Sequence, residues 1–298
     1  MRRLTIPLAA LVALAAAVPA ANATFPGRNG SVAFSIEQSR NEQNGNLAYR
    51  AISTVKQPDF RRPDARGRHD RLLRECRMPE EEPNSGDCSI DYRDPAWSPD
   101  GRRLVFDTGR SLALIDARGS RFRKLEAFSA DDGEPAFSPS GSRIAFSGRS
   151  GARKALFVAN LSGGQARRVA SEGGSPDWSR RDLIAFVRRG AIYSVRASGS
   201  DLQRLTAGRD PSWAPSGREI AFARRDGIYV ARADGRRARR VVRCSGCRAP
   251  AFSPDGGLLV YDGGGLHVAR VRDGRRLLTL VEDVPGFDAS SPAWQPLR

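Results

Sequence analysis

The 298-residue sequence has few of the side chains that carry most enzyme chemistry. It contains only two histidines and four cysteines, so a histidine-rich metal cluster is excluded. It has no G-x-S-x-G motif and no P-loop, and the run "DGGG" at Asp262 is typical of a hairpin turn rather than of a phosphate cradle. These absences leave a serine hydrolase of the elbow type and a nucleotide-binding enzyme without support.

Lysine is also scarce, although the chain is strongly basic. Only three of the 49 basic residues are lysine, so 49 − 3 = 46 are arginine, and the formal net charge is +16. Such an arginine bias often reflects the base composition of the coding DNA, but the positive charge would also attract an anionic partner. We expect no specific binding of nucleic acid.

Long apolar runs are confined to the N-terminus. Residues 1–23 combine two arginines, an apolar stretch and the small-residue site Ala21-Asn22-Ala23, which predicts a cleaved signal peptide. No cysteine follows the apolar stretch, so a lipid anchor is not expected, and no later segment is long and apolar enough to cross a bilayer. We therefore expect residues 24–298 to form one exported, monomeric domain that is periplasmic, attached to the cell wall or extracellular.

One motif recurs along this domain. The stretch "DPAWSPDG", from Asp94, has near-copies in "EPAFSPSG", "DPSWAPSG" and "APAFSPDG". Its aromatic residue recurs at intervals of 40, 41, 35, 39 and 42 residues, at Trp97, Phe137, Trp178, Trp213, Phe252 and Trp294. A period near forty predicts a repeat architecture.

Each repeat is expected to form four short strands, and its second strand is apolar at successive positions, which indicates cover on both faces. Four strands per repeat predict an all-β propeller. Five repeats are complete. The N-terminal "SVAF" and "NLAYRA" would join the orphan C-terminal "SSPAWQP" in a further blade. The prediction is a six-bladed β-propeller closed by pairing of the N- and C-terminal segments.

The "PAWSPDGRRLVF" repeats resemble the TolB-type β-propeller repeat over essentially the whole mature chain. The resemblance implies a six-bladed propeller that works in the bacterial envelope with peptidoglycan-associated partners. TolB-like proteins carry a separate α/β domain before the propeller, whereas this sequence shows the propeller only.

The first repeat is about thirty residues longer than the period, and the excess at about 54–88 is rich in proline and charge, which predicts a surface insertion. Cys76 and Cys244 each end an expected fourth strand, and Cys88 and Cys247 each precede an innermost strand. Of the three possible pairings, Cys76–Cys88 and Cys244–Cys247 need no long-range contact and are favoured for an exported protein. The spacing of "CSGC" also occurs in redox sites, but no helix is expected there.

Two groups of residues are candidates for binding. The residues three positions before the motif aromatics are Asp94, Glu134, Ser175, Asp210 and Ser291, with Ala249 before the remaining aromatic, Phe252. If the innermost strands line the axis, these residues form a ring at one mouth of the channel. The ring could bind Ca²⁺ or a cationic group, and the alternative is that its residues only cap strand ends. The second group lies on a fourth strand and consists of Arg236, Arg237, Arg239 and Arg240. These arginines either bind a polyanion or prevent edge-to-edge pairing at the rim. His267 aligns with aromatic residues and is expected to be a packing residue.

The sequence thus favours an exported, non-catalytic scaffold that binds a partner protein or an anionic envelope polymer and needs no cofactor, with Ca²⁺ as the one possible exception. The alternatives are a propeller enzyme, such as a metal-assisted hydrolase or lactonase in the central channel, and an accessory module for a separate peptidase. Fold alone does not decide among them.

Overall fold

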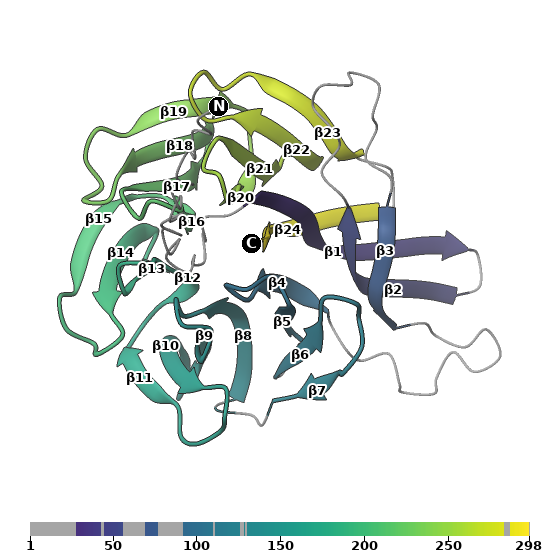
Figure 1. Ribbon diagram of the computed structural model, residues 1–298, viewed down its shortest axis with the longest axis horizontal. Helices are drawn as coiled ribbons and strands as arrows, with labels where there is room; N and C mark the ends of the chain where they lie inside the picture. The colour runs from purple at the N-terminus through teal and green to yellow at the C-terminus, as the bar shows by residue number, and fades with distance from the viewer. Residues whose placement is uncertain are drawn as a thin grey trace, which may run out of the picture.

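The computed structural model describes residues 28–42, 45–55, 69–76, 92–109, 111–125, 128, 130–282 and 287–297. These residues form six four-stranded antiparallel sheets arranged as blades around a central axis (Figure 1). The described ranges contain strands and turns and no helix, and consequently no helix there could span a membrane. The all-β, six-bladed propeller predicted from the repeat is confirmed.

Blades two to six follow the chain, each running from the axis outward. Blades two and three contain β4 (Arg93–Trp97), β5 (Arg103–Asp107), β6 (Leu112–Asp116), β7 (Arg123–Lys124), β8 (Ala130–Phe137), β9 (Arg143–Ser150), β10 (Arg153–Asn160) and β11 (Arg167–Ala170). Blade four contains β12 (Gly174–Trp178), β13 (Leu183–Arg188), β14 (Ala191–Arg196) and β15 (Gln203–Ala207). Blades five and six contain β16 (Arg209–Trp213), β17 (Glu219–Arg224), β18 (Gly227–Arg232), β19 (Arg239–Arg243), β20 (Arg248–Phe252), β21 (Leu258–Asp262), β22 (Gly265–Arg270) and β23 (Arg276–Glu282).

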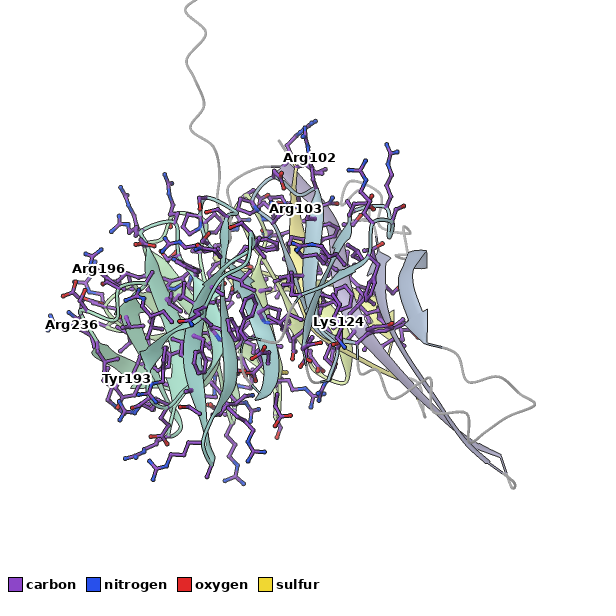
Figure 2. The ribbon with its side chains drawn as sticks, turned by 90° about the horizontal axis from the view of Figure 1, so that it is seen from below. Arg102, Arg103, Lys124, Tyr193, Arg196 and Arg236 are labelled. Carbon is purple, nitrogen blue, oxygen red and sulfur yellow. A yellow bond between two sulfur atoms is a disulfide. The ribbon has the colours of Figure 1, made fainter. Side chains whose placement is uncertain are left out.

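Blade one joins the two ends of the chain. Its order is β24 (Phe287–Leu297), β1 (Arg28–Glu42), β2 (Gly45–Val55) and β3 (His69–Cys76), so the C-terminal strand is innermost. Ala33 pairs with Ala293 and Val32 with Trp294, which confirms the predicted closure. The hairpin of β1 and β2 extends beyond the disc of blades (Figure 2).

The predicted insertion at 54–88 is divided by a strand. β3 lies inside it and forms the outermost strand of blade one, as the stretch "RLLREC" predicted. Residues 56–68 and 77–91, like the proposed signal peptide at 1–23, lie outside the described residues.

The hydrophobic core is divided among the interfaces between blades. Each of six buried clusters combines residues of two neighbouring blades and contains one motif aromatic. Trp178 and Trp213 are fully buried. The second strands are buried at successive positions, as in Leu104–Asp107 of β5. An aromatic ring fills the wedge between two twisted sheets, so the repeated aromatic is a packing residue.

The rest of the motif forms the turn between the first and second strands. The N–H of Gly101 donates to the carbonyl of Ser98 at 2.8 Å, and Gly101 has a φ of 65°, which glycine adopts without strain. Arg102 and Arg103 mark this end of the propeller, which we call the turn face (Figure 2). The innermost strands begin at the opposite end, the mouth face.

Candidate functional site

The six innermost strands surround a cavity of about 300 Å³ on the axis. The residues three positions before the motif aromatics all line it, and we call them the mouth residues: Asp94, Glu134, Ser175, Asp210, Ala249 and Ser291. The structure therefore brings the five predicted ligand-binding residues around one cavity, and Ala249 completes the ring.

All six mouth residues share an unusual backbone conformation. Their φ angles lie between 47° and 51°, in the left-handed region, although none is glycine and each precedes a proline. Each sits in a β-bulge of its strand, as between Arg93 and Ala96 in β4. This conformation costs a non-glycine residue about 1–2 kcal/mol, and bulges reorient side chains at functional sites. The motif did not predict this left-handed conformation, because the residue before a proline usually prefers an extended conformation.

The left-handed conformation lets the mouth residues bond across the blades in three pairs. The N–H of Ser175 donates to Glu134 Oε2 at 2.8 Å, and the N–H of Ala249 donates to Asp210 Oδ2 at 3.1 Å. Ser291 Oγ donates to Asp94 Oδ1 at 2.6 Å. Each pair contains one carboxylate, so the ring is held together by its acids, which therefore cap the neighbouring strands as well as line the cavity.

The three mouth carboxylates differ in their electrostatic surroundings. Burial raises the pKa of Asp94, and the hydrogen bond from Ser291 offsets part of this rise. Burial likewise raises the pKa of Asp210 against the opposing effect of the Ala249 N–H. Burial would also raise the pKa of Glu134, but the charge of Lys154, 2.9 Å away, and hydrogen bonds outweigh it, so that the pKa is lowered. A cationic group entering the mouth would favour the ionised forms of Asp94 and Asp210, which burial disfavours.

A fourth carboxylate, Asp177, lies deeper in the channel wall. It accepts the N–H of Trp213 at 2.6 Å and so joins blades four and five. Burial raises its pKa from the usual 3.8 to about 6, despite hydrogen bonds from the N–H groups of Trp213 and Trp178. Sequence reasoning missed this residue. The available signal was its position directly before the motif aromatic, where the other repeats have alanine or serine.

The donors that could hold a metal are separated around the ring. Within the described ranges, no three His, Cys, Asp or Glu side chains come close enough together to share an ion. The Ca²⁺ site considered from the sequence stays a prediction, and it would need hydroxyl or backbone oxygens beside the carboxylates.

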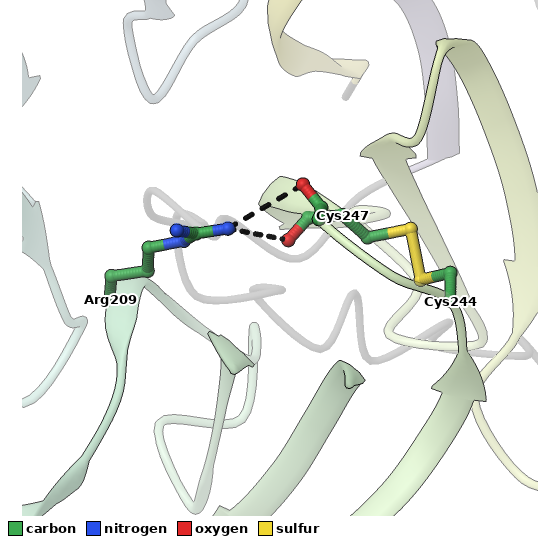
Figure 3. The surroundings of a disulfide bond; sticks show 4 residues. Arg209, Cys244 and Cys247 are labelled. Atoms are coloured by element: carbon green, nitrogen blue, oxygen red, sulfur yellow. Dashed lines mark hydrogen bonds between the residues drawn. A yellow bond between two sulfur atoms is a disulfide. The ribbon is translucent and has the colours of Figure 1, made fainter. Parts of the chain in front are cut away.

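The loop between blades five and six holds the predicted Cys244–Cys247 pair. Their Cα atoms are 5.9 Å apart and their sulfur atoms are within bonding distance (Figure 3). Arg209 Nη2 donates to the carbonyls of Gly246, at 3.5 Å, and Cys247, at 3.3 Å. Cys88 and the side chain of Cys76 lie outside the described residues, so that pair, like oxidation of both pairs in the cell, stays a prediction.

The four rim arginines of the polyanion prediction are all exposed, but they differ in their contacts. Arg240 bonds Asp226 at 2.6 Å, and Arg239 donates to the carbonyl of Val271 in blade six at 3.0 Å. Arg236, at the outer edge in Figure 2, and Arg237 form no ion pair with the described residues. Of the four rim arginines, Arg236 and Arg237 are therefore the two that could bind an external anion without breaking a contact with another described residue.

The contact of Arg239 belongs to a repeated pattern. In three blades the arginine at the start of the fourth strand donates to a carbonyl just after the next blade's third strand. The donors are Arg123, Arg167 and Arg239. Part of the arginine excess thus stabilises the contacts between blades.

His267 occupies the packing position expected from the alignment. It is buried, its Nδ1 lies 3.1 Å from Thr279 Oγ1, and its ring lies 5.5 Å from that of Tyr261. Burial lowers its pKa, so the neutral ring is favoured. It does not line the central cavity.

Comparisons with solved structures show the fold. The crystal structure of TolB from Acinetobacter baumannii superposes with a TM-score of 0.68 at 17% identity over 90% of this chain and 67% of that one. Hydrazine synthase from Kuenenia stuttgartiensis superposes with a TM-score of 0.66 at 11% identity over 90% of this chain and 47% of that one. The same architecture thus occurs in proteins with different names and tasks.

Comparisons of sequence are more specific. A protein named TolB homolog from Chlorobium chlorochromatii (strain CaD3) is 33% identical over 134 residues, which are 40% of this chain and 30% of that protein. The chain therefore matches about a third of this relative's length. The model of the TolB β-propeller domain matches residues 86–255, more than half of the chain. The chain belongs to the TolB β-propeller domain family.

Proposed function

We propose that this protein is an exported, non-catalytic scaffold of the cell envelope that binds a cationic segment of a partner protein at the mouth of its channel. The observation that carries the proposal is the convergence of Asp94, Glu134 and Asp210 on one cavity. Burial raises the pKa of two of them, Asp94 and Asp210, and the positive charge of a lysine or arginine side chain would stabilise their ionised forms. The cavity lining includes neither histidine nor cysteine.

Envelope location is part of the same proposal. It is supported by the signal peptide expected at residues 1–23, by the expected disulfides and by membership of the TolB propeller family. Detection of the protein, shortened by the first 23 residues, in the exported fraction of the cells would test it.

Crosslinking in the native envelope, followed by mass spectrometry, tests the binding role. We expect one abundant partner protein crosslinked to the wild type and lost from the triple variant Asp94→Asn, Glu134→Gln, Asp210→Asn. The control is Asp201→Asn, which removes an exposed carboxylate bonded to Arg196 away from the mouth. Equal crosslinking by the triple variant would contradict the proposal, and a peptidase as the partner would support the accessory role.

Binding of an anionic envelope polymer is the second form of the scaffold proposal. Since Arg239 and Arg240 serve internal contacts, the test is Arg236→Gln with Arg237→Gln. Retention by the protein's own cell-wall fraction should fall for this pair and persist for Arg118→Gln, an exposed arginine of blade two. Unchanged retention of the double variant would count against a polymer site at the rim.

One observation favours an enzyme, namely Asp177. A carboxyl group with a pKa of about 6 in a channel wall is suited to proton transfer near neutral pH. A panel of lactones and esters, assayed with Ca²⁺ and with chelator, should show no turnover if the protein is a scaffold. Turnover that is lost in Asp177→Asn would instead identify a hydrolase or lactonase.

A further inference from the structure

A second cavity, of about 540 Å³, opens on the mouth face between blades three and four. Its walls are the hairpins β9–β10 and β13–β14, and its floor is the chain that leads into β12. We call it the basic pocket, and it is lined by Arg153, Lys154, Glu172, Gly173, Gly174, Val187, Arg188 and Arg189.

Gly174 lines the basic pocket at a position where three other blades have an arginine. The residue before the mouth residue is an arginine in three blades, namely Arg93, Arg209 and Arg248, at the same register of β-pairing. Blade three has Gly133 there, but Asp107 fills that space, since a Cβ on Gly133 would lie 2.6 Å from Asp107 Oδ2. At blade four the side chains of Glu134 and Lys154 approach this position, since a Cβ on Gly174 would lie 2.9 Å from Glu134 Oε2 and 3.4 Å from Lys154 Cδ.

The lining of the basic pocket carries an excess of positive charge. Four cations face one carboxylate, that of Glu172, so the formal charge of the lining is 4 − 1 = +3. Glu172 lies 2.9 Å from Arg189 and 3.6 Å from Arg188, and the hydrogen bond from Arg189 lowers its pKa. Arg153 forms no ion pair with any described residue. Lys154 is paired with Glu134, so Glu172 faces the three arginines of the lining, and an anion would offset the positive charge that remains.

The basic pocket adjoins the acidic mouth. Lys154 lines the pocket and bonds the mouth residue Glu134 at 2.9 Å. Gly174 lines the pocket and is followed by the mouth residue Ser175. Two sites of opposite charge therefore lie side by side on one face.

We propose that the basic pocket binds an anionic group, a carboxylate or a phosphate, of the same ligand whose cationic group enters the mouth. The inference rests on the proposed function for its second half. Guanidinium groups are suited to both kinds of anion, because their planar fork of donors matches the spacing of the oxygens. The partner segment would then carry a positive and a negative group next to each other.

Isothermal titration of the purified protein with inorganic phosphate and, separately, with succinate tests the pocket by itself. We expect at least one anion to bind saturably at concentrations below about 10 mM, and the identity of that anion decides between phosphate and carboxylate. Arg153→Gln with Arg189→Gln should weaken binding about tenfold or more. These exposed hairpin residues leave the hydrophobic core unchanged.

The matched control is Arg225→Gln. Arg225 is the exposed hairpin residue of blade five that corresponds to Arg189 of blade four, and it does not line the basic pocket. It should bind the anion as the wild type does. Absence of saturable binding by both anions, or equal loss in the control and in the double variant, would overturn the inference.

A short peptide with adjacent lysine and glutamate links the pocket to the mouth. Replacement of the glutamate by glutamine should weaken peptide binding to the wild type but not to the Arg153→Gln, Arg189→Gln variant. If anions bind the pocket but the peptide is indifferent to Asp94→Asn with Asp210→Asn, the proposed function fails while the pocket stands. The opposite result is that the mouth variants abolish peptide binding, replacement of the peptide's glutamate does not weaken it, and neither anion binds. The pocket inference then fails while the proposed function stands.

Discussion

The two ends of the innermost strands differ in what they keep constant. At the turn face, the residue after the motif aromatic donates its N–H to the second strand at 2.8–2.9 Å in each of blades two to six, whether it is serine or alanine. At the mouth face the backbone conformation is equally constant, but the side chains are Asp, Glu, Ser, Asp, Ala and Ser. The comparison teaches that the repeated residues form the fold, while the variable side chains on a constant backbone are free to form a binding site.

Removal of Ser290–Arg298 should have the largest effect on stability. β24 is the innermost strand of blade one, and Trp294 belongs to the cluster between blades six and one. Its loss opens the ring and exposes that cluster, so we expect the melting temperature to fall by at least about 10 °C. A melt unchanged in circular dichroism would contradict closure by the chain ends.

Trp213→Ala and Asp210→Asn contrast the two ends of β16. Trp213 is fully buried, so its truncation should cost about 3–5 kcal/mol of unfolding free energy in urea. Asp210→Asn keeps an oxygen acceptor for the Ala249 N–H and should cost about 1 kcal/mol or less. A comparable loss for both would contradict the division into structural and variable ends.

Trp213→Phe is the control for this contrast. The buried indole Nε1 of Trp213 has no hydrogen-bond partner in the described structure, and two other blades have phenylalanine at this position. We therefore expect a smaller loss than for alanine.

Asp177 should give the stability a dependence on pH. Its pKa is about 6 in the folded protein and is near 3.8 in an unfolded chain, so the native state binds the proton more tightly. Stability is therefore highest below pH 4 for this group and falls as the pH rises through 6, by about 2–3 kcal/mol in total.

Comparison with Asp177→Asn isolates this effect from those of Asp94 and Asp210, whose pKa values are also raised. Asparagine retains an acceptor for the Trp213 N–H. The difference in urea stability between variant and wild type should grow in favour of the variant between pH 4 and pH 7.5. A constant difference would show that Asp177 titrates normally.

Ala249→Gly should have the smallest effect and the opposite sign. Ala249 has a φ of 47°, which glycine adopts without strain, so we expect a gain of about 0.5–1 kcal/mol. Ala251→Gly, two residues along the same strand, should instead cost about 0.5–1 kcal/mol because its φ is not in the left-handed region. Destabilisation by both glycines would contradict strain at the mouth.

Much of the fold could be predicted because it depends on local patterns. The spacing of the motif aromatics gave the number of blades, and the orphan strand at Trp294 gave the closure. The Cys244–Cys247 proximity followed from a short loop. The left-handed mouth conformation was not predictable, because it depends on bonds to neighbouring blades such as that from Ser175 to Glu134.

The sequence by itself determined the six blades, the pairing of the two chain ends in one blade and the position of the mouth residues. These features depend on the alternation of strands and turns within each repeat. Only the tertiary structure decided which carboxylates have raised pKa values, that Asp177 joins two blades, and that a basic pocket lies beside an acidic mouth. The physical reason is that burial and charge balance at these sites are set by side chains from different blades, which approach one another only when the ring closes.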